Sequence, residues 1–171
     1  MAGDPTKASH WPDADVYVAP LATAVPATAA TAFGVGWNLV GLLDGDSGFP
    51  EAREEDVADH YAWGGILVRT TRRQFKLTKR FTALEDNATT KALIWPGSTA
   101  TALSVPRPIN QLVAFETREG AKIKRLITAN YAQVAIDGDI TDSEGDLTRY
   151  EFIATIFPTG AGVLFTRQDS V

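Results

Sequence analysis

Residues 150–157, Tyr-Glu-Phe-Ile-Ala-Thr-Ile-Phe, are the stretch that decides the expected fold. Their β-branched and aromatic side chains are typical of a strand. A strand with one solvated face alternates apolar and polar residues, but here large apolar groups fall on both faces, as they do at residues 66–68 and 39–40. We therefore expect a mainly β protein whose sheets are covered on both sides, either by a closed sandwich or barrel or by neighbouring subunits.

The rest of the chain adds further strands and one helix to this sheet. Strand patterns occupy residues 16–19, 36–43, 61–81, 109–117 and 122–136. Thr82 and Glu85 have the spacing of a capping box, and apolar residues then recur at helical intervals until Pro96. The sequence therefore predicts a β-sandwich or barrel-like fold with one flanking α-helix at about 82–95.

The length of 171 residues suits a single domain. Residues 1–15 lack periodicity and are expected to form a mobile N-terminal arm, followed by one β domain over 16–158 and a C-terminal tail over 159–171. Residues 44–60 contain Gly and Pro but no β-branched run, so we expect a long loop there. No run approaches the roughly 18 unbroken apolar residues of a membrane span, so no membrane segment is expected.

The formal net charge of −5 is divided among three blocks. Residues 44–59 carry seven acids and one base, residues 69–80 carry six bases and no acid, and residues 137–151 carry six acids and one base. Charge segregated in this way suggests surfaces that meet other surfaces. The candidate contact residues are Asp46, Glu51, Glu54, Glu55, Asp56 and Asp59 in the expected 44–60 loop, Arg69, Arg72, Arg73, Lys76 and Arg80 in the basic strand, and Asp137, Asp139, Asp142, Glu144 and Asp146 in an acidic hairpin.

The residue types argue against an enzyme and against a bound metal or cofactor. Without cysteine the chain has no disulfide, thiol nucleophile or iron–sulfur ligand, and two histidines make a zinc site improbable. Residues 45–50 resemble the nucleophile loop of trypsin-like serine proteases, but only His10 precedes them, so a turn is favoured. Residues 137–141 begin like a calcium loop, yet Asp142 and Thr148 stand where glycine and glutamate are needed.

The basic stretch from Arg69 to Phe81 leaves alternative functions open. Bases interleaved with aromatics on strands bind single-stranded nucleic acid by stacking and phosphate neutralisation. However, Phe75, Leu77 and Phe81 share one face, which suits a core, and the bases could equally meet the acidic block of a neighbouring copy. A monomeric single-stranded nucleic-acid-binding module is therefore one alternative, and a β-sandwich that binds carbohydrate or a host surface is a less favoured one.

Several segments, taken in order, resemble the major tail tube proteins of long-tailed, siphovirus-type phages, particularly those of actinobacteria. They are Val-Tyr-Val-Ala-Pro at 16–20, Trp-Asn-Leu-Val-Gly-Leu at 37–42, Ala-Trp-Gly-Gly at 62–65, and Phe-Thr-Ala-Leu-Glu-Asp-Asn at 81–87. The resemblance extends over most of residues 16–158.

The resemblance implies a structural role without catalysis. Hexameric rings would stack into a non-contractile tail tube, with the sheets of six subunits joined into one inner barrel, and the 44–60 loop would order against the next ring. The implied partners are further copies of the chain, the tape measure protein, and the tail terminator and baseplate proteins. Genomic double-stranded DNA would pass through without specific binding. The expected location is the virion tail, with the host cytoplasm during assembly.

Overall fold

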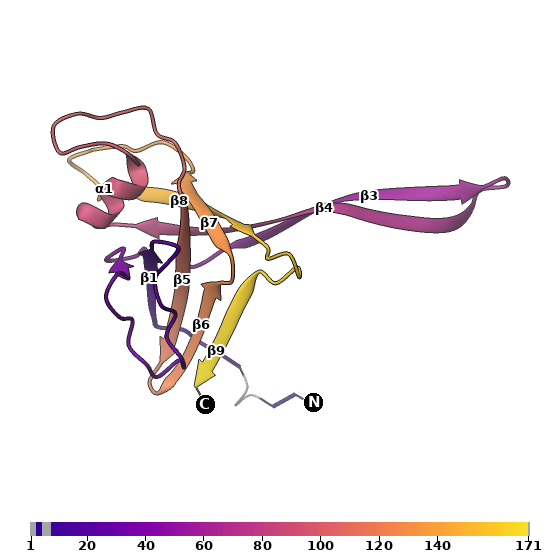
Figure 1. The fold of residues 1–171 in the computed structure, drawn as a ribbon, viewed down its shortest axis with the longest axis horizontal. Coiled ribbons are helices and arrows are strands. Elements are labelled where there is room, and N and C mark those ends of the chain that lie inside the picture. Colours follow the sequence, from indigo (N-terminus) through magenta and orange to yellow (C-terminus); the bar gives the residue numbers. More distant parts are fainter. Residues whose placement is uncertain (1–2, 5–7, 171) are drawn as a thin grey trace.

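The fold, described by a computed structural model, is an antiparallel β architecture with one short helix (Figure 1). The structure describes residues 3–4 and 8–170. The elements are β1 (Asp13–Ala19), β2 (Asn38–Leu39), β3 (Glu51–Ala62), β4 (Ile66–Ala83), α1 (Ala88–Ile94), β5 (Asn110–Glu119), β6 (Lys122–Thr128), β7 (Tyr131–Ile136), β8 (Tyr150–Phe157) and β9 (Phe165–Ser170). The prediction of a mainly β fold with one helix is confirmed.

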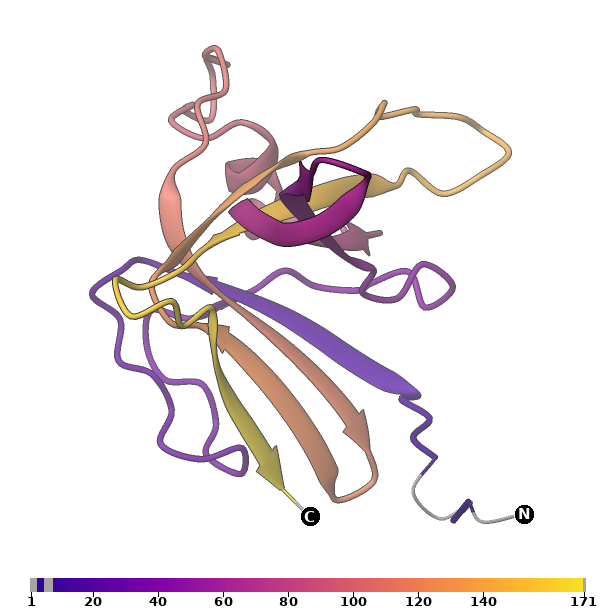
Figure 2. The same ribbon diagram turned by 90° about the vertical axis from the view of Figure 1, so that its right-hand side faces the viewer.

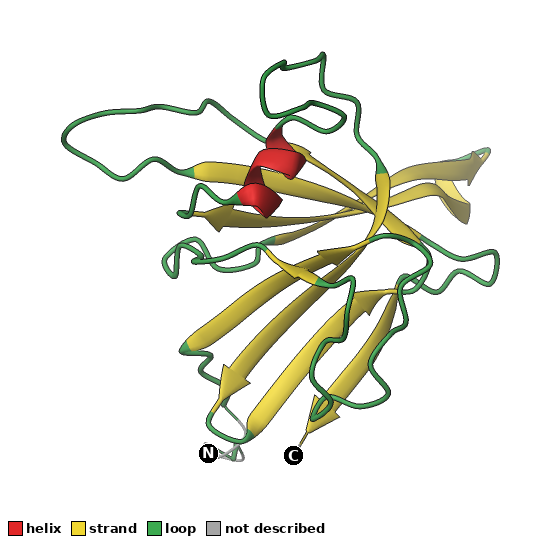
Figure 3. Ribbon diagram, turned by 60° about the vertical axis from the view of Figure 1, so that its left-hand side comes forward, coloured by secondary structure: helices red, strands yellow, loops and turns green. Residues whose placement is uncertain are grey.

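The strands form two sheets that share β5. The lower sheet has the order β2-β1-β5-β6-β9, and the upper sheet has the order β5-β7-β8-β4-β3. The start of β5, at Asn110 and Gln111, pairs with β7, whereas the rest of β5 pairs with β1 and β6. Figure 2 shows β1, β5, β6 and β9 side by side below, and Figure 3 shows the strands of the upper sheet crossing above them.

The main core lies between the two sheets. Val16 and Phe115 of the lower sheet and Phe81 and Phe152 of the upper sheet are almost completely buried, and the rings of Phe81 and Phe152 stack at 5.1 Å. Along β8, every second residue from Phe152 to Ile156 is buried, and the opposite face is exposed or half-buried. The chain itself therefore provides the complete cover for only one face of this strand.

The long loop predicted at 44–60 is wrong over most of its length. Only residues 44–50 connect, and Glu51–Ala62 is strand β3, paired antiparallel with β4. The acidic residues face basic ones across the ladder, with Glu54 opposite Lys76 and Asp56 opposite Arg73. Opposite charges on neighbouring strands stabilise a sheet without any apolar alternation. Because both faces of β3 are solvated, the usual strand pattern is missing from the sequence.

The helix is shorter than predicted and has a different cap. Thr82 belongs to β4, where it pairs with Glu151, so the strand continues through the residue expected to start the helix. Asn87 is the N-cap, and its side chain accepts hydrogen bonds from the backbone N–H groups of Thr89 and Thr90. Glu85 instead accepts a hydrogen bond from the backbone N–H of Leu42 at 3.0 Å. Thr82 and Glu85 therefore do not cap the helix: Thr82 belongs to the β4 ladder, and Glu85 binds the backbone at Leu42.

Four other expected segments differ from the structure. The strand expected at 36–43 is reduced to β2 and a single bridge between Leu43 and Ala83. The run 122–136 is divided into β6 and β7. The expected tail at 159–171 contains β9, which pairs with β6 along its whole length. The expected arm at 1–15 lies partly outside the described residues, and β1 already begins at Asp13.

Candidate functional site

The most distinctive surface feature is a two-stranded arm, residues 51–76 of β3 and β4, which projects from the body (Figure 1). All twelve residues of β3 are exposed, and on β4 full burial begins only at Leu77. At about 3.3 Å per residue, the strands extend roughly 40 Å. An isolated two-stranded ribbon is marginally stable in water. The arm therefore depends on its cross-strand pairs or on a partner.

The first two charge blocks meet each other within the arm. Arg72 contacts Glu55 at 2.9 Å, and Lys76 contacts Glu54 at 3.7 Å. Closer to the body, Lys79 contacts Glu51 at 3.5 Å. Exposed ion pairs contribute about 0–1 kcal/mol each, so these pairs fix the register of the ribbon more than they stabilise the protein. Much of the charge that the sequence offered for contact with another copy is thus paired in the same chain.

The remaining basic candidates have different surroundings. Arg80 pairs with Asp137, which ties the base of β4 to the start of the acidic connection 137–149. Arg69 and Arg73 make no ion pair with any residue that the structure describes. Both lie on the distal half of β4, just before and after the paired Arg72. Asp56 lies opposite Arg73 and Asp59 lies opposite Thr70, so the distal arm has both arginines and carboxylates that form no ion pair.

The acidic candidates are divided in the same way. The loop residue Asp46 uses its backbone N–H to donate to Asp44, and Asp59 accepts a 2.7 Å hydrogen bond from Thr70. Between β7 and β8, the Asp142 carboxylate accepts from the Thr148 hydroxyl, and Asp146 lies 4.0 Å from Arg149. Among these acidic candidates, those that make no ion pair in the described chain are Asp46, Asp56, Asp59, Asp139, Asp142 and Glu144. No group of three or more potential ligands for a metal occurs among the residues described.

The arm ends in an apolar tip, residues 61–68. Gly65 N–H donates to Ala62 C=O at 3.1 Å and closes a turn, in which Gly64 has φ +88°. That left-handed conformation favours glycine, and it leaves Trp63 at the corner of the turn with its side chain fully exposed. Tyr61 and Ile66 are also more than three-fifths exposed. An exposed aromatic and apolar cluster marks an interaction surface.

The lower sheet has two incompletely paired margins. β9 pairs only with β6, and β1 is covered on its outer side only from Val16 to Val18, by the short β2 and by Val40. Asp13–Asp15 on one margin and all of β9 on the other therefore present backbone groups with no ladder partner in the described chain. Open edges of this kind are templates for pairing with another strand.

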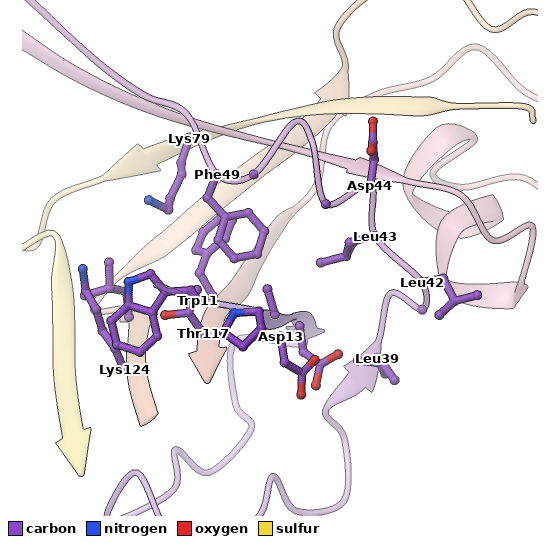
Figure 4. Close-up of a pocket in the computed structure, with 18 of the residues that line it drawn as sticks. Trp11, Asp13, Leu39, Leu42, Leu43, Asp44, Phe49, Lys79, Thr117 and Lys124 are labelled. Atoms are coloured by element: carbon purple, nitrogen blue, oxygen red, sulfur yellow. The ribbon is translucent and has the colours of Figure 1, made fainter. Parts of the chain in front are cut away.

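A pocket of about 590 Å³ lies between the N-terminal residues 11–15, the connection 39–49 and the lower sheet (Figure 4). Figure 4 shows Lys79 and Phe49 on one side and Trp11 and Lys124 on the other. The Lys79 ammonium lies 5.4 Å from the centre of the Phe115 ring. Burial lowers the pKa of Lys79, and the neighbouring Glu51 carboxylate opposes this effect without cancelling it. The lining combines apolar side chains with two lysines and with the carboxylates of Asp13, Asp15, Asp44 and Glu85.

A buried ion pair fastens the 20–37 connection to the lower sheet. Arg125 donates from Nε to Glu116 at 2.6 Å, and both side chains are only 4% exposed. The same guanidinium donates to the carbonyls of Thr28 and Thr31 and lies over the Phe33 ring. This network holds the connection 20–37 against the lower sheet, including the Gln168 side chain of β9.

Sequence reasoning identified the charge blocks but missed the tip, the edge strand β9 and the buried pair. The Trp-Gly-Gly turn between two strand-like runs was the available signal for the tip. Among the described residues, no helix has the length and apolar character needed to cross a membrane. No protein-family model and no curated protein matches the chain.

Proposed function

We propose that this protein is a structural subunit without catalytic activity that assembles into stacked rings, forming a tail tube like those of long-tailed phages. In this proposal genomic DNA passes through the tube into the host. The ring order is six, as the resemblance to tail tube proteins implies. Tape measure, terminator and baseplate proteins would contact the assembled tube, which belongs to the virion and is built in the host cytoplasm.

The observation that carries the proposal is the strand direction in the lower sheet. β1, β5, β6 and β9 are consecutive antiparallel neighbours, so β1 and β9 run in opposite directions. In a ring of identically oriented copies, β9 of one copy would therefore meet β1 of the next as an antiparallel neighbour. The antiparallel order of strands would continue across every boundary between subunits, and closure of the ring would pair both open edges of each copy.

The arm supports stacking as the second direction of assembly. It projects beyond the body, it has no core of its own, and it ends in exposed apolar groups. An appendage of this kind gains stability when a partner covers it. A chain with open sheet margins and a projecting arm has separate contacts for forming a ring and for joining one ring to the next.

The nucleic-acid-binding alternative has less support from the arm. Arg72, Lys76 and Arg80 already have carboxylate partners, and Leu77 and Phe81 are buried in the body. Only Arg69, Arg73 and the partly exposed Phe75 remain for a strand of nucleic acid. The net charge of −5 also opposes phosphate binding, and it suits a conduit that DNA must leave.

Negative-stain electron microscopy of concentrated protein tests the proposal. We expect tubes of stacked rings from the wild type, and no tubes but at most single rings from a variant in which residues 56–73 are replaced by an Asn-Gly turn. The shortened variant should keep its unfolding transition, because the removed residues contribute nothing to the core. A strictly monomeric wild type that retains a single-stranded oligonucleotide at moderate salt would instead support the alternative.

A further inference from the structure

The apolar tip has a candidate receptor at the other end of the same molecule. A groove of about 330 Å³ lies beside the C-terminal end of α1, and all ten of its lining residues are apolar or proline. Its walls include Leu93 and Trp95 of the α1 region, Pro106 of the following connection, Ile136 of β7, and Ile140. The volume is at the lower end of ligand pockets, about 300 Å³ and upward, and suits an aromatic side chain rather than a large ligand.

Tip and groove lie at opposite poles. In Figure 1 the tip marks one end of the long axis, and α1 with the connection 95–109 marks the other. Figure 3 shows α1 at the front together with the long connections around it. A copy displaced along this axis would bring its tip to the α1 end of the next copy. Such a contact joins two different surfaces, so it can repeat without limit and build a stack.

The two surfaces belong to segments whose net charges have opposite signs, because residues 56–73 of the arm carry three bases and two acids, whereas the connection 137–149 is acidic. Behind the tip are Arg69 and Arg73, which make no ion pair within the described chain. At the groove, Ile140 belongs to the connection 137–149, which has five acids and one base. In this connection Asp139 and Glu144 make no ion pair among the described residues. Complementary charge around an apolar centre orients encounter and excludes wrong partners.

We propose that the tip of one copy docks in the α1 groove of the next copy, with Trp63 inserted between Trp95 and Ile140 and with Arg69 and Arg73 facing the 137–149 connection. This inference rests on the proposed stacking function and assigns the contact that would join one ring to the next. The occupant of the groove is therefore a second copy of this chain. A membrane surface, to which an aromatic tip backed by arginines could also bind, is the competing partner.

The absence of native cysteine allows a direct test by disulfide trapping. Protein with Trp63→Cys is mixed with protein carrying Ile140→Cys and oxidised at a concentration high enough for the Trp63→Cys protein itself to assemble. We expect an intermolecular disulfide between these positions. The control partner is Val35→Cys, because Val35 is fully exposed and distant from the groove lining. Assemblies that form normally but link the Trp63→Cys protein no better to the Ile140→Cys protein than to the Val35→Cys protein would overturn the docking while leaving the proposed function intact.

A second pair of variants measures the strength of the contact. Trp63→Ser should leave the unfolding transition unchanged and raise the concentration needed for assembly by about 30-fold or more, the size of an interface hot spot. Val35→Ser is the matched control and should leave this concentration unchanged. Unchanged assembly by Trp63→Ser would overturn the docking. So would sedimentation of wild type, but not Trp63→Ser, with vesicles of phosphatidylcholine and phosphatidylserine. A wild type that never assembles would remove the proposed function together with this inference.

Discussion

The arm and the body are both antiparallel sheet, but different forces hold them. In the body, Phe81 and Phe152 stack in a core that excludes water, and apolar periodicity marks the strands. In the arm, Arg72–Glu55 and Lys76–Glu54 pairs lie in solvent, and no apolar periodicity marks β3. Burial of a large apolar side chain contributes about 1.5–3 kcal/mol to stability, whereas an exposed ion pair contributes about 0–1 kcal/mol. The body can therefore provide stability while the arm remains available for contact.

The largest difference in stability between body and arm is expected for buried and exposed aromatic rings. Phe152→Ala should lower the free energy of unfolding by about 3–5 kcal/mol, because a fully buried ring is replaced by a cavity. Phe75→Ala removes the same group from the arm, where the ring is 43% exposed, and should cost less than about 1 kcal/mol. Denaturant unfolding of both variants measures the difference. Equal losses would show that the arm shares the stability of the core.

A second comparison uses one buried and one exposed ion pair. Arg125→Ala leaves the Glu116 carboxylate buried without its main partner and should cost about 3–5 kcal/mol. Arg72→Ala breaks the exposed pair with Glu55 and should cost no more than about 1 kcal/mol. Thermal or denaturant unfolding provides both values. A destabilisation of Arg72→Ala close to that of Arg125→Ala would mean that the arm is not merely a solvated ribbon.

The charge pairing of the arm can be inverted as well as removed. Glu54→Lys with Glu55→Lys replaces the carboxylates that contact Lys76 and Arg72 by like charges and should destabilise the ribbon by about 1 kcal/mol. Limited proteolysis should then cut the arm faster while the core transition is unchanged. Adding Arg72→Glu and Lys76→Glu to the same protein should restore protection. A failure of this reversal to restore protection would argue against cross-strand pairing.

The smallest effect concerns the lysine where arm and body meet. Because burial lowers the folded-state pKa of Lys79, the folded protein loses this proton at a lower pH than the unfolded chain. Between the two pKa values the unfolded state binds more protons, so stability should rise with pH. Relative to Lys79→Met, the wild type should therefore gain stability as pH rises toward 10.5, the ordinary pKa of a lysine. Chemical denaturation over this range measures it, and parallel pH profiles would contradict it.

The sequence predicted the body better than the arm for a physical reason. Burial produces patterns, so residues 150–157 and the single helix were found, although the capping-box spacing at Thr82 misplaced the helix start. Solvated strands such as β3 have no such pattern, because the partner of each acid lies about twenty residues away in the sequence. The opposite signs of the two blocks were visible, but their pairing within one chain depends on the turn at Gly64 and Gly65. The edge strand β9 was likewise missed, because it is a strand only through its pairing with β6.

The most direct test of the central claim, that copies join through the lower sheet, is a disulfide across its margins. Ala14 and Asp169 lie in the same row, linked through Thr117 and Lys124, and three strand spacings separate them within one chain. That is about 14 Å, too far for an internal disulfide. Oxidised Ala14→Cys/Asp169→Cys protein should give a ladder of covalent oligomers that ends at a closed ring of six. A second variant, Ala14→Cys/Arg167→Cys, tests the pairing of the two strands shifted by two residues. The control is Ala14→Cys/Val35→Cys. If both test variants give only monomers, as this control does at the same concentration, the account is contradicted.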